Sequence, residues 1–156
     1  MIEPRSVVHF SIAVSDLDAS QKFYTEILGL TLVQAVPANG MVFLRAGNDH
    51  VILAKSDAPL HRDAKDSRRA HHAFKVDSEK YEDAKVFLAS KGVEVFEEED
   101  RKKGVFVGRQ FYIRDPDGTV IEFTEWDGAS RLDSPSRRTL TNSGIAEARR
   151  LEPPVA

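Results

Sequence analysis

Hydrophobic and polar residues alternate along short runs of the chain, and two longer stretches have helical spacing. Residues 7–14 alternate with period 2, which predicts a strand with one face in the core. The side chains on that core face are Phe10, Ile12 and Val14. Residues 15–28 place apolar side chains four positions apart. We therefore predict a helix that begins with a capping box at Ser15 and Asp18 and ends at Gly29.

The same order returns 62 residues later, from His9 in the first copy to His71 in the second. Each copy begins with a histidine on a strand-like segment, continues with a helix-like stretch and reaches a glycine before the next strand. The second helix is predicted near residues 78–91, before Gly92. Its predicted inward residues are Ala84, Phe87 and Leu88. We interpret the chain as a tandem duplication of one βαβ-type module.

Short strands and turns complete both modules. The predicted strands cover residues 30–36, 42–46 and 51–55 in the first module, and 93–98, 110–114 and 119–126 in the second. Residues 97–100 are predicted to form a solvated acidic turn, and residues 115–118 a turn that their Pro and Gly favour. We predict one domain over residues 1–128, with modules at about 7–56 and 70–126. Residues 129–156, rich in Ser, Arg and Pro, are predicted to form an arm or a mobile tail.

Composition narrows the function classes. The 156 residues suit one compact domain, and a net charge of -3 argues against a nucleic-acid binder. Cysteine is absent from the sequence, so disulfides and thiolate metal ligands are excluded. No apolar run approaches the roughly 20 residues that a membrane helix needs, and the first residues lack the pattern of a signal peptide. We therefore expect a cytoplasmic protein with no membrane partner.

Three side chains are candidate metal ligands. His9 and His71 stand at matched positions of the repeat, on the strand face opposite the core residues. His72 falls on the core face, so His71 is the counterpart of His9. On the last strand Glu122 lies opposite the core face. Two imidazoles and one carboxylate suit Mn, Fe, Ni or Zn, and three protein ligands leave positions open for water and substrate.

Several motifs, taken in order, carry a resemblance to a known group of proteins. They are residues 9–14, 23–24, 28–30, 71–74, 111–112, 115–118 and 121–123. Together these motifs resemble the vicinal oxygen chelate superfamily, which includes glyoxalase I, fosfomycin-resistance thiol transferases, extradiol dioxygenases and bleomycin-binding proteins. The resemblance implies an α+β fold of two tandem βαβββ modules, whose sheets curl around a metal cleft, with ligands at His9, His71 and Glu122. Because members are often dimers with clefts built from paired modules, we expect a homodimer.

Positions at which this sequence departs from the motifs of individual branches help to distinguish among the branches of the superfamily. Enzymes like glyoxalase I carry a fourth ligand, a Glu, at a position that we match to Leu53, and leucine cannot bind a metal. We place His50 on the opposite face from that position, as a strand-edge residue. Extradiol dioxygenases share the signature of residues 111–118, but they need a histidine several residues earlier, where Lys, Gly and Val occupy 103–105.

The fosfomycin thiol transferases bind their metal with three ligands and no fourth Glu, which is the ligand pattern expected for this chain. The resemblance makes four residues candidates for substrate binding or catalysis: Tyr112, Arg131, Lys102 and Ser11. The potassium-binding loop of those enzymes is rich in Ser and Glu, and residues 106–110 lack such oxygens here. We predict a metal-dependent enzyme that acts on a small oxygen-bearing molecule, resembling a fosfomycin-type transferase with a thiol cosubstrate. The alternatives are an Fe(II) extradiol dioxygenase, a lyase like glyoxalase I, and a metal-free drug-binding protein.

Overall fold

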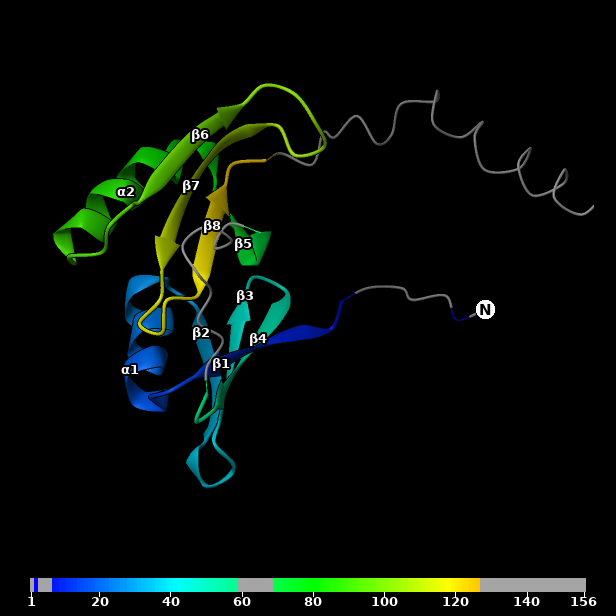
Figure 1. The fold of residues 1–156 in the computed structure, drawn as a ribbon, viewed down its shortest axis with the longest axis vertical. Coiled ribbons are helices and arrows are strands. Elements are labelled where there is room, and N and C mark those ends of the chain that lie inside the picture. Colours follow the sequence, from blue (N-terminus) through cyan, green and yellow to red (C-terminus); the bar gives the residue numbers. More distant parts are fainter. Residues whose placement is uncertain (1, 3–6, 59–68, 127–156) are drawn as a thin grey trace, which may run out of the picture.

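The computed structural model describes residues 2, 7–58 and 69–126 of the chain, and within them two four-stranded mixed sheets (Figure 1). The elements of the first module are β1 (His9–Val14), α1 (Leu17–Lys22), η1 (Phe23–Ile27), β2 (Thr31–Val36), η2 (Pro37–Asn39), β3 (Met41–Ala46) and β4 (Asp49–Lys55). Its strand order is β1-β4-β3-β2, and only the β1–β4 pair is parallel. No helix among the described residues is long and apolar enough to cross a membrane.

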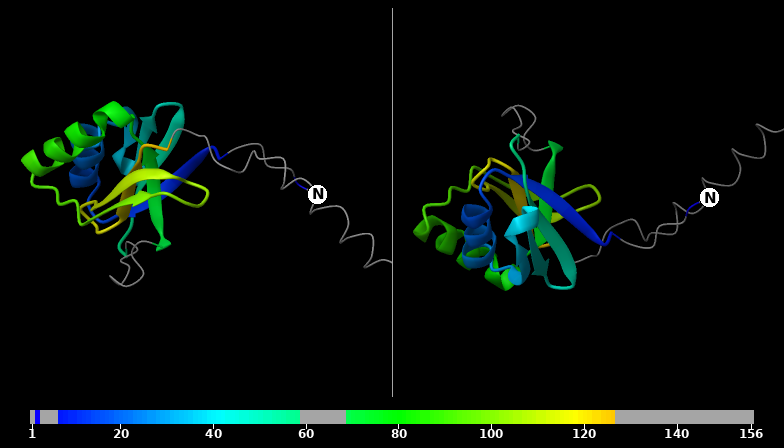
Figure 2. Two further views of the ribbon diagram at one scale, coloured as in Figure 1. Left: turned by 90° about the horizontal axis from the view of Figure 1, so that it is seen from above. Right: turned by 90° about the horizontal axis from the view of Figure 1, so that it is seen from below.

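The second module repeats this topology. Its elements are β5 (His71–Lys75), η4 (Ser78–Lys80), α2 (Tyr81–Ser90), β6 (Glu97–Arg101), β7 (Gly108–Arg114) and β8 (Val120–Thr124). The strand order β5-β8-β7-β6 matches that of the first sheet element by element. Helices α1 and α2 lie along one side of the molecule and the strands along the other (Figure 2). The predicted α+β fold of two βαβββ modules is therefore confirmed.

Helix α1 begins and ends through local chemistry. Asp16 is the N-cap, and its carboxylate accepts the backbone N–H groups of Asp18 and Ala19, both at 3.0 Å. The predicted capping box is therefore wrong, because Asp16 takes the place assigned to Ser15. The last turn widens into the π-helix η1, and Gly29 follows with φ of +75°, the left-handed conformation predicted for it.

Helix α2 packs through a different set of residues from the predicted one. Leu88 is buried and Ala84 is partly buried in the core, as predicted. Phe87 is 42% exposed, so its predicted inward position is wrong, while the fully buried Tyr81 was not predicted. Tyr81 precedes Ala84 by three residues and Leu88 by seven, so it shares their face of the helix, whereas Phe87 falls at the edge of that face. Gly92 ends the helix with φ of +72°, as predicted.

The acidic run 97–100 lies in strand β6. Both predictions here are wrong in part, because the strand begins four residues later than 93 and the acidic residues form no turn. Lys85 of α2 donates to Glu98 at 2.8 Å, and the Tyr81 hydroxyl donates to the same carboxylate at 3.2 Å. Charged side chains are common on edge strands, where they oppose pairing with other chains. The edge position of β6 and the contacts of Glu98 with α2 are therefore compatible with a strand of acidic residues.

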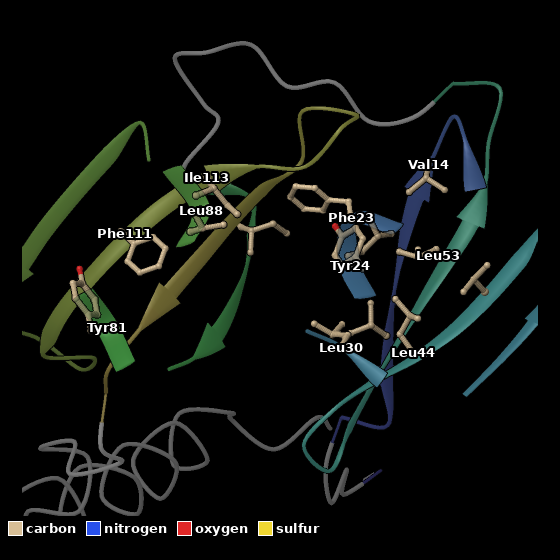
Figure 3. Close-up of a cluster of buried hydrophobic side chains, with 14 residues drawn as sticks. Val14, Phe23, Tyr24, Leu30, Leu44, Leu53, Tyr81, Leu88, Phe111 and Ile113 are labelled. Carbon is tan, nitrogen blue, oxygen red and sulfur yellow. The ribbon is translucent and has the colours of Figure 1, made fainter. Parts of the chain in front are cut away.

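Buried side chains of both modules form one hydrophobic cluster (Figure 3). A polar contact joins the modules beside it. The hydroxyl of Tyr24, which is fully buried, donates to the Asp115 carboxylate at 2.9 Å. Nearby, the Ser15 backbone N–H donates to Asp117 at 2.9 Å. The turn of residues 115–118 therefore anchors the β7–β8 hairpin of the second module to the first helix of the other.

Candidate functional site

His71 and Glu122 meet on the face of the second sheet that points away from the core. The His71 Nε2 and Glu122 Oε2 atoms are 3.0 Å apart, and Glu122 is 6% exposed. His72 points to the opposite side, where its ring stacks on Phe10 with centroids 5.2 Å apart. Burial lowers the pKa of His72, and the nearby His71 adds to that effect. The predicted assignment of the two neighbouring histidines to opposite faces is confirmed.

Tyr112 completes a cluster with this pair. Its Cα is paired with that of Glu122 across β7 and β8. Its ring meets His71 edge to face, with centroids 5.9 Å apart. Burial raises the pKa of Tyr112, and the Glu122 carboxylate raises it further, so the phenol stays protonated at neutral pH. Tyr112 can therefore donate a hydrogen bond inside the site.

These three residues line a cavity of about 740 Å³, a size typical of small-molecule sites. Three cations line the same cavity: Arg69, Lys75 and Arg101. Two aromatic residues, Phe106 and Trp126, also line it. Sequence reasoning did not name these five residues as site residues. Alternation from His71 places Lys75 on the site face, and alternation from Glu122 leads to Trp126, whereas loop residue Phe106 gave no such signal.

The donors of the pair suit a divalent metal. Imidazole nitrogen and carboxylate oxygen are donor types that such ions bind. The His71 Nε2 and Glu122 Oε2 atoms lie 3.0 Å apart, the distance of a direct ion pair, so one donor of each type already points to the same place. Within the described ranges, however, no group of three His, Asp or Glu side chains is placed to hold a metal ion. The structure thus brings together two of the three predicted ligands.

The other predicted site residues lie elsewhere. His9 and Ser11 are exposed on β1 and are not among the residues that line the cavity. The Lys102 side chain is 77% exposed, pairs with Asp100, and lies outside the cavity as well. Arg131 lies outside the described residues.

Strand register corrects the sequence alignment of the two modules. Ala73, two residues after His71, is paired with Glu122. Its counterpart in the first module is Ser11, two residues after His9, and Ser11 is paired with Ile52. Ile52, and not Leu53, is therefore the match of Glu122; Leu53 is buried in the core. His50 is the Cα partner of His9 and lies on the face opposite the buried Leu53, as predicted; the face it occupies is the one that carries Ile52. The first module still offers no carboxylate at the matched position.

Known proteins resemble this chain over most of its length. The chain is 34% identical to glutathione transferase FosA of Serratia marcescens over 128 residues, which cover 82% of this chain and 86% of FosA. It is 28% identical to metallothiol transferase FosB of Staphylococcus epidermidis over 121 residues, which cover 78% of this chain and 82% of FosB.

A solved structure has the same fold. A mutant of the fosfomycin resistance protein FosX from Listeria monocytogenes, crystallised with Mn(II) and 1S,2S-dihydroxypropylphosphonic acid, superimposes with a TM-score of 0.65 at 20% identity. The match covers 79% of this chain and 91% of that one. Residues 6–123 match the family model described as the Glyoxalase/Bleomycin resistance protein/Dioxygenase superfamily. The chain belongs to this superfamily.

Proposed function

We propose that this protein is a metal-dependent transferase of the fosfomycin-resistance type, which adds a thiol to the epoxide of a small phosphonate. The observation that carries the proposal is the His71–Glu122 pair at 3.0 Å, in a cavity lined by three cations. The 34% identity to a glutathione transferase supports the choice of reaction. A divalent metal bound there would act as a Lewis acid toward a substrate oxygen.

The chain's own residues have distinct roles in this proposal. Arg69, Lys75 and Arg101 would hold the phosphonate through charge-assisted hydrogen bonds. The protonated Tyr112 phenol would donate a hydrogen bond to a substrate oxygen beside Glu122. The nucleophile must come from a thiol cosubstrate, because the sequence contains no cysteine. Arg131 stays a candidate for substrate binding, whereas the position of Lys102 gives that residue no support.

His9 enters the proposal through a second copy of the chain. It is exposed on β1, away from the cavity, and the neighbouring Val7 and Val8 are 72% and 74% exposed. Apolar residues this exposed suit burial against another surface. We propose a homodimer in which His9 of one subunit completes the ligand set of His71 and Glu122 in the other.

The test combines metal binding with turnover. We expect Mn(II) at a hundredfold excess over its Kd to raise the free energy of unfolding by about 2.7 kcal/mol, and the metal-loaded protein to consume fosfomycin and a thiol together. Glu122→Gln should lose both effects. Glu79→Gln, a matched change of an exposed residue in η4, should keep both. Metal binding without any thiol-dependent loss of fosfomycin would reject the reaction, and unchanged stability with Mn(II), Fe(II), Ni(II) and Zn(II) would reject the site.

A further inference from the structure

The end of the cavity remote from the metal pair is aromatic. Phe106, in the loop between β6 and β7, meets Trp126 edge to face with ring centroids 4.9 Å apart. Phe106 is 48% exposed, although it is a large apolar residue. Both rings line the same cavity as His71 and Glu122. An exposed aromatic wall inside a ligand-sized cavity is a surface that an apolar group of a ligand can cover.

A three-carbon epoxide phosphonate cannot reach this wall from the metal pair. Trp126 follows Glu122 by four residues along β8 and its extension, a distance of about 13 Å at 3.3 Å per residue. A three-carbon phosphonate is roughly 5 Å long, from bond lengths near 1.5 Å. Lys75 lies between the two ends, because its Cα is paired with that of Thr124. The cavity thus offers a donor pair, then Lys75, then aromatic rings along one direction. Arg101, whose guanidinium is ion-paired with Glu99 at 2.9 Å, lies level with the aromatic end, because its Cα is paired with that of Gly108 beside Trp126.

The loop that forms the aromatic end has Val, Phe, Val and Gly at 105–108, with no side-chain oxygen or nitrogen. That end of the cavity therefore offers apolar and aromatic contacts to a ligand. We propose that this cavity prefers, among the anionic electrophiles it accepts, one that carries an aromatic group, with its acid held by Lys75 and Arg101 and its ring on Phe106 and Trp126. The inference rests on the proposed function for the electrophilic group and for the placement of the anionic group.

The test compares two unreactive ligands on the Mn(II)-loaded protein, 3-phenylpropylphosphonate and propylphosphonate. Calorimetry should show the phenyl compound binding about tenfold more tightly, a difference of about 1.4 kcal/mol. Trp126 is the only tryptophan of the chain, so its fluorescence should change with the phenyl compound alone. Phe106→Ala should abolish the tenfold gain and leave the affinity for propylphosphonate unchanged. Phe87→Ala, on α2 and similarly exposed at 42%, should leave both affinities unchanged.

Three results would overturn the inference: equal affinities for the two ligands, no binding of either one, or an equal loss of both affinities in Phe106→Ala. If Phe106→Ala fails to fold, Phe106→Leu keeps the apolar volume, and it should still lose most of the gain. Trp126→Phe retains an aromatic ring, so it should keep the gain in calorimetry while the fluorescence signal disappears. Fosfomycin turnover is measured separately. Its absence would reject the proposed reaction without altering the ratio of the two affinities.

Discussion

The hydrogen bond between Tyr24 and Asp115 allows us to predict how much stability the protein loses when the hydroxyl is removed. The Tyr24 side chain is fully buried, and its hydroxyl donates to Asp115 Oδ2 at 2.9 Å across the two modules. The other carboxylate oxygen, Oδ1, already accepts the N–H groups of Asp117 and Thr119, at 3.0 and 2.7 Å. Tyr24→Phe therefore leaves Oδ2 buried without that partner, in a carboxylate that is 5% exposed.

We expect Tyr24→Phe to lower the free energy of unfolding by about 2 kcal/mol at neutral pH, since hydrogen bonds to charged groups contribute about 1.5–3 kcal/mol. The melting temperature should fall by about 4–8 °C, at 2–4 °C per kcal/mol for a chain of this length. Tyr81→Phe is the matched control. Tyr81 is equally buried, but its partner Glu98 has a side chain 43% exposed, so water can replace the lost hydroxyl. The control should lose less than about 1 kcal/mol.

The stability deficit of Tyr24→Phe should also depend on pH, in a direction that follows from the pKa of Asp115. Burial raises the pKa of Asp115 above its ordinary 3.8, and the hydrogen bond from Tyr24 partly offsets that rise. A carboxyl whose pKa is raised by folding favours the folded state at low pH, and this contribution is lost as the pH rises through the folded pKa. Tyr24→Phe raises the pKa of Asp115 further. The variant's deficit should therefore be about 2 kcal/mol at neutral pH and about 1 kcal/mol below the unfolded pKa, where the lost bond is neutral.

Urea unfolding of both tyrosine variants at about pH 7 and pH 3.5 measures these differences by linear extrapolation. A deficit for Tyr24→Phe no larger than that of Tyr81→Phe would show that the buried carboxylate does not depend on the hydroxyl. A deficit that grows at low pH would show that the Tyr24 hydroxyl stabilises the protonated form of Asp115 more than the carboxylate, opposite to the direction given above. Either result would refute the account of this contact.

Two further predictions concern the metal ligands. His71→Ala should abolish the rise in melting temperature that Mn(II) produces, whereas His72→Ala should keep it, because the His72 ring stacks on Phe10 in the interior; the reverse result would place the ligand on the other face of β5. Variants His9→Ala and His71→Ala should each be inactive alone, but coexpressed they should recover about a quarter of the wild-type activity, since half of the dimers would hold one intact site of two. A coexpressed pair without activity would contradict a site shared between subunits.

Sequence pattern predicted the faces of the strands well, because side-chain alternation is a local property of the backbone. It placed Ile12 and Val14 in the core and separated His71 from His72, and the structure agrees. The hydrophobic and polar pattern failed to predict secondary structure where that structure depends on residues distant in the sequence. The residues at 97–100 form a strand because they pair with β7, and Lys85 and Tyr81 of α2 bind Glu98; nothing within that acidic run indicates those partners.

The candidate site shows the same division between local and distant information. Parity predicted that Glu122 lies opposite the core, and its 3.0 Å approach to His71 followed once the β5–β8 pairing brought the two strands together. The cation and aromatic walls were not predicted, because Arg101 and Phe106 come from β6 and the loop after it, where the predicted strand began too early.

The two modules have kept one topology and diverged in chemistry. In the second sheet the position beside Ala73 is Glu122, and in the first the equivalent position beside Ser11 is Ile52. The first module therefore presents an imidazole without a carboxylate, while the second presents both. In the proposed dimer, two-fold pairing would set the His9 face of one chain against the Glu122 face of the other twice. The two modules would then carry different parts of the proposed metal site, of which a single copy brings together His71 and Glu122 within the described residues.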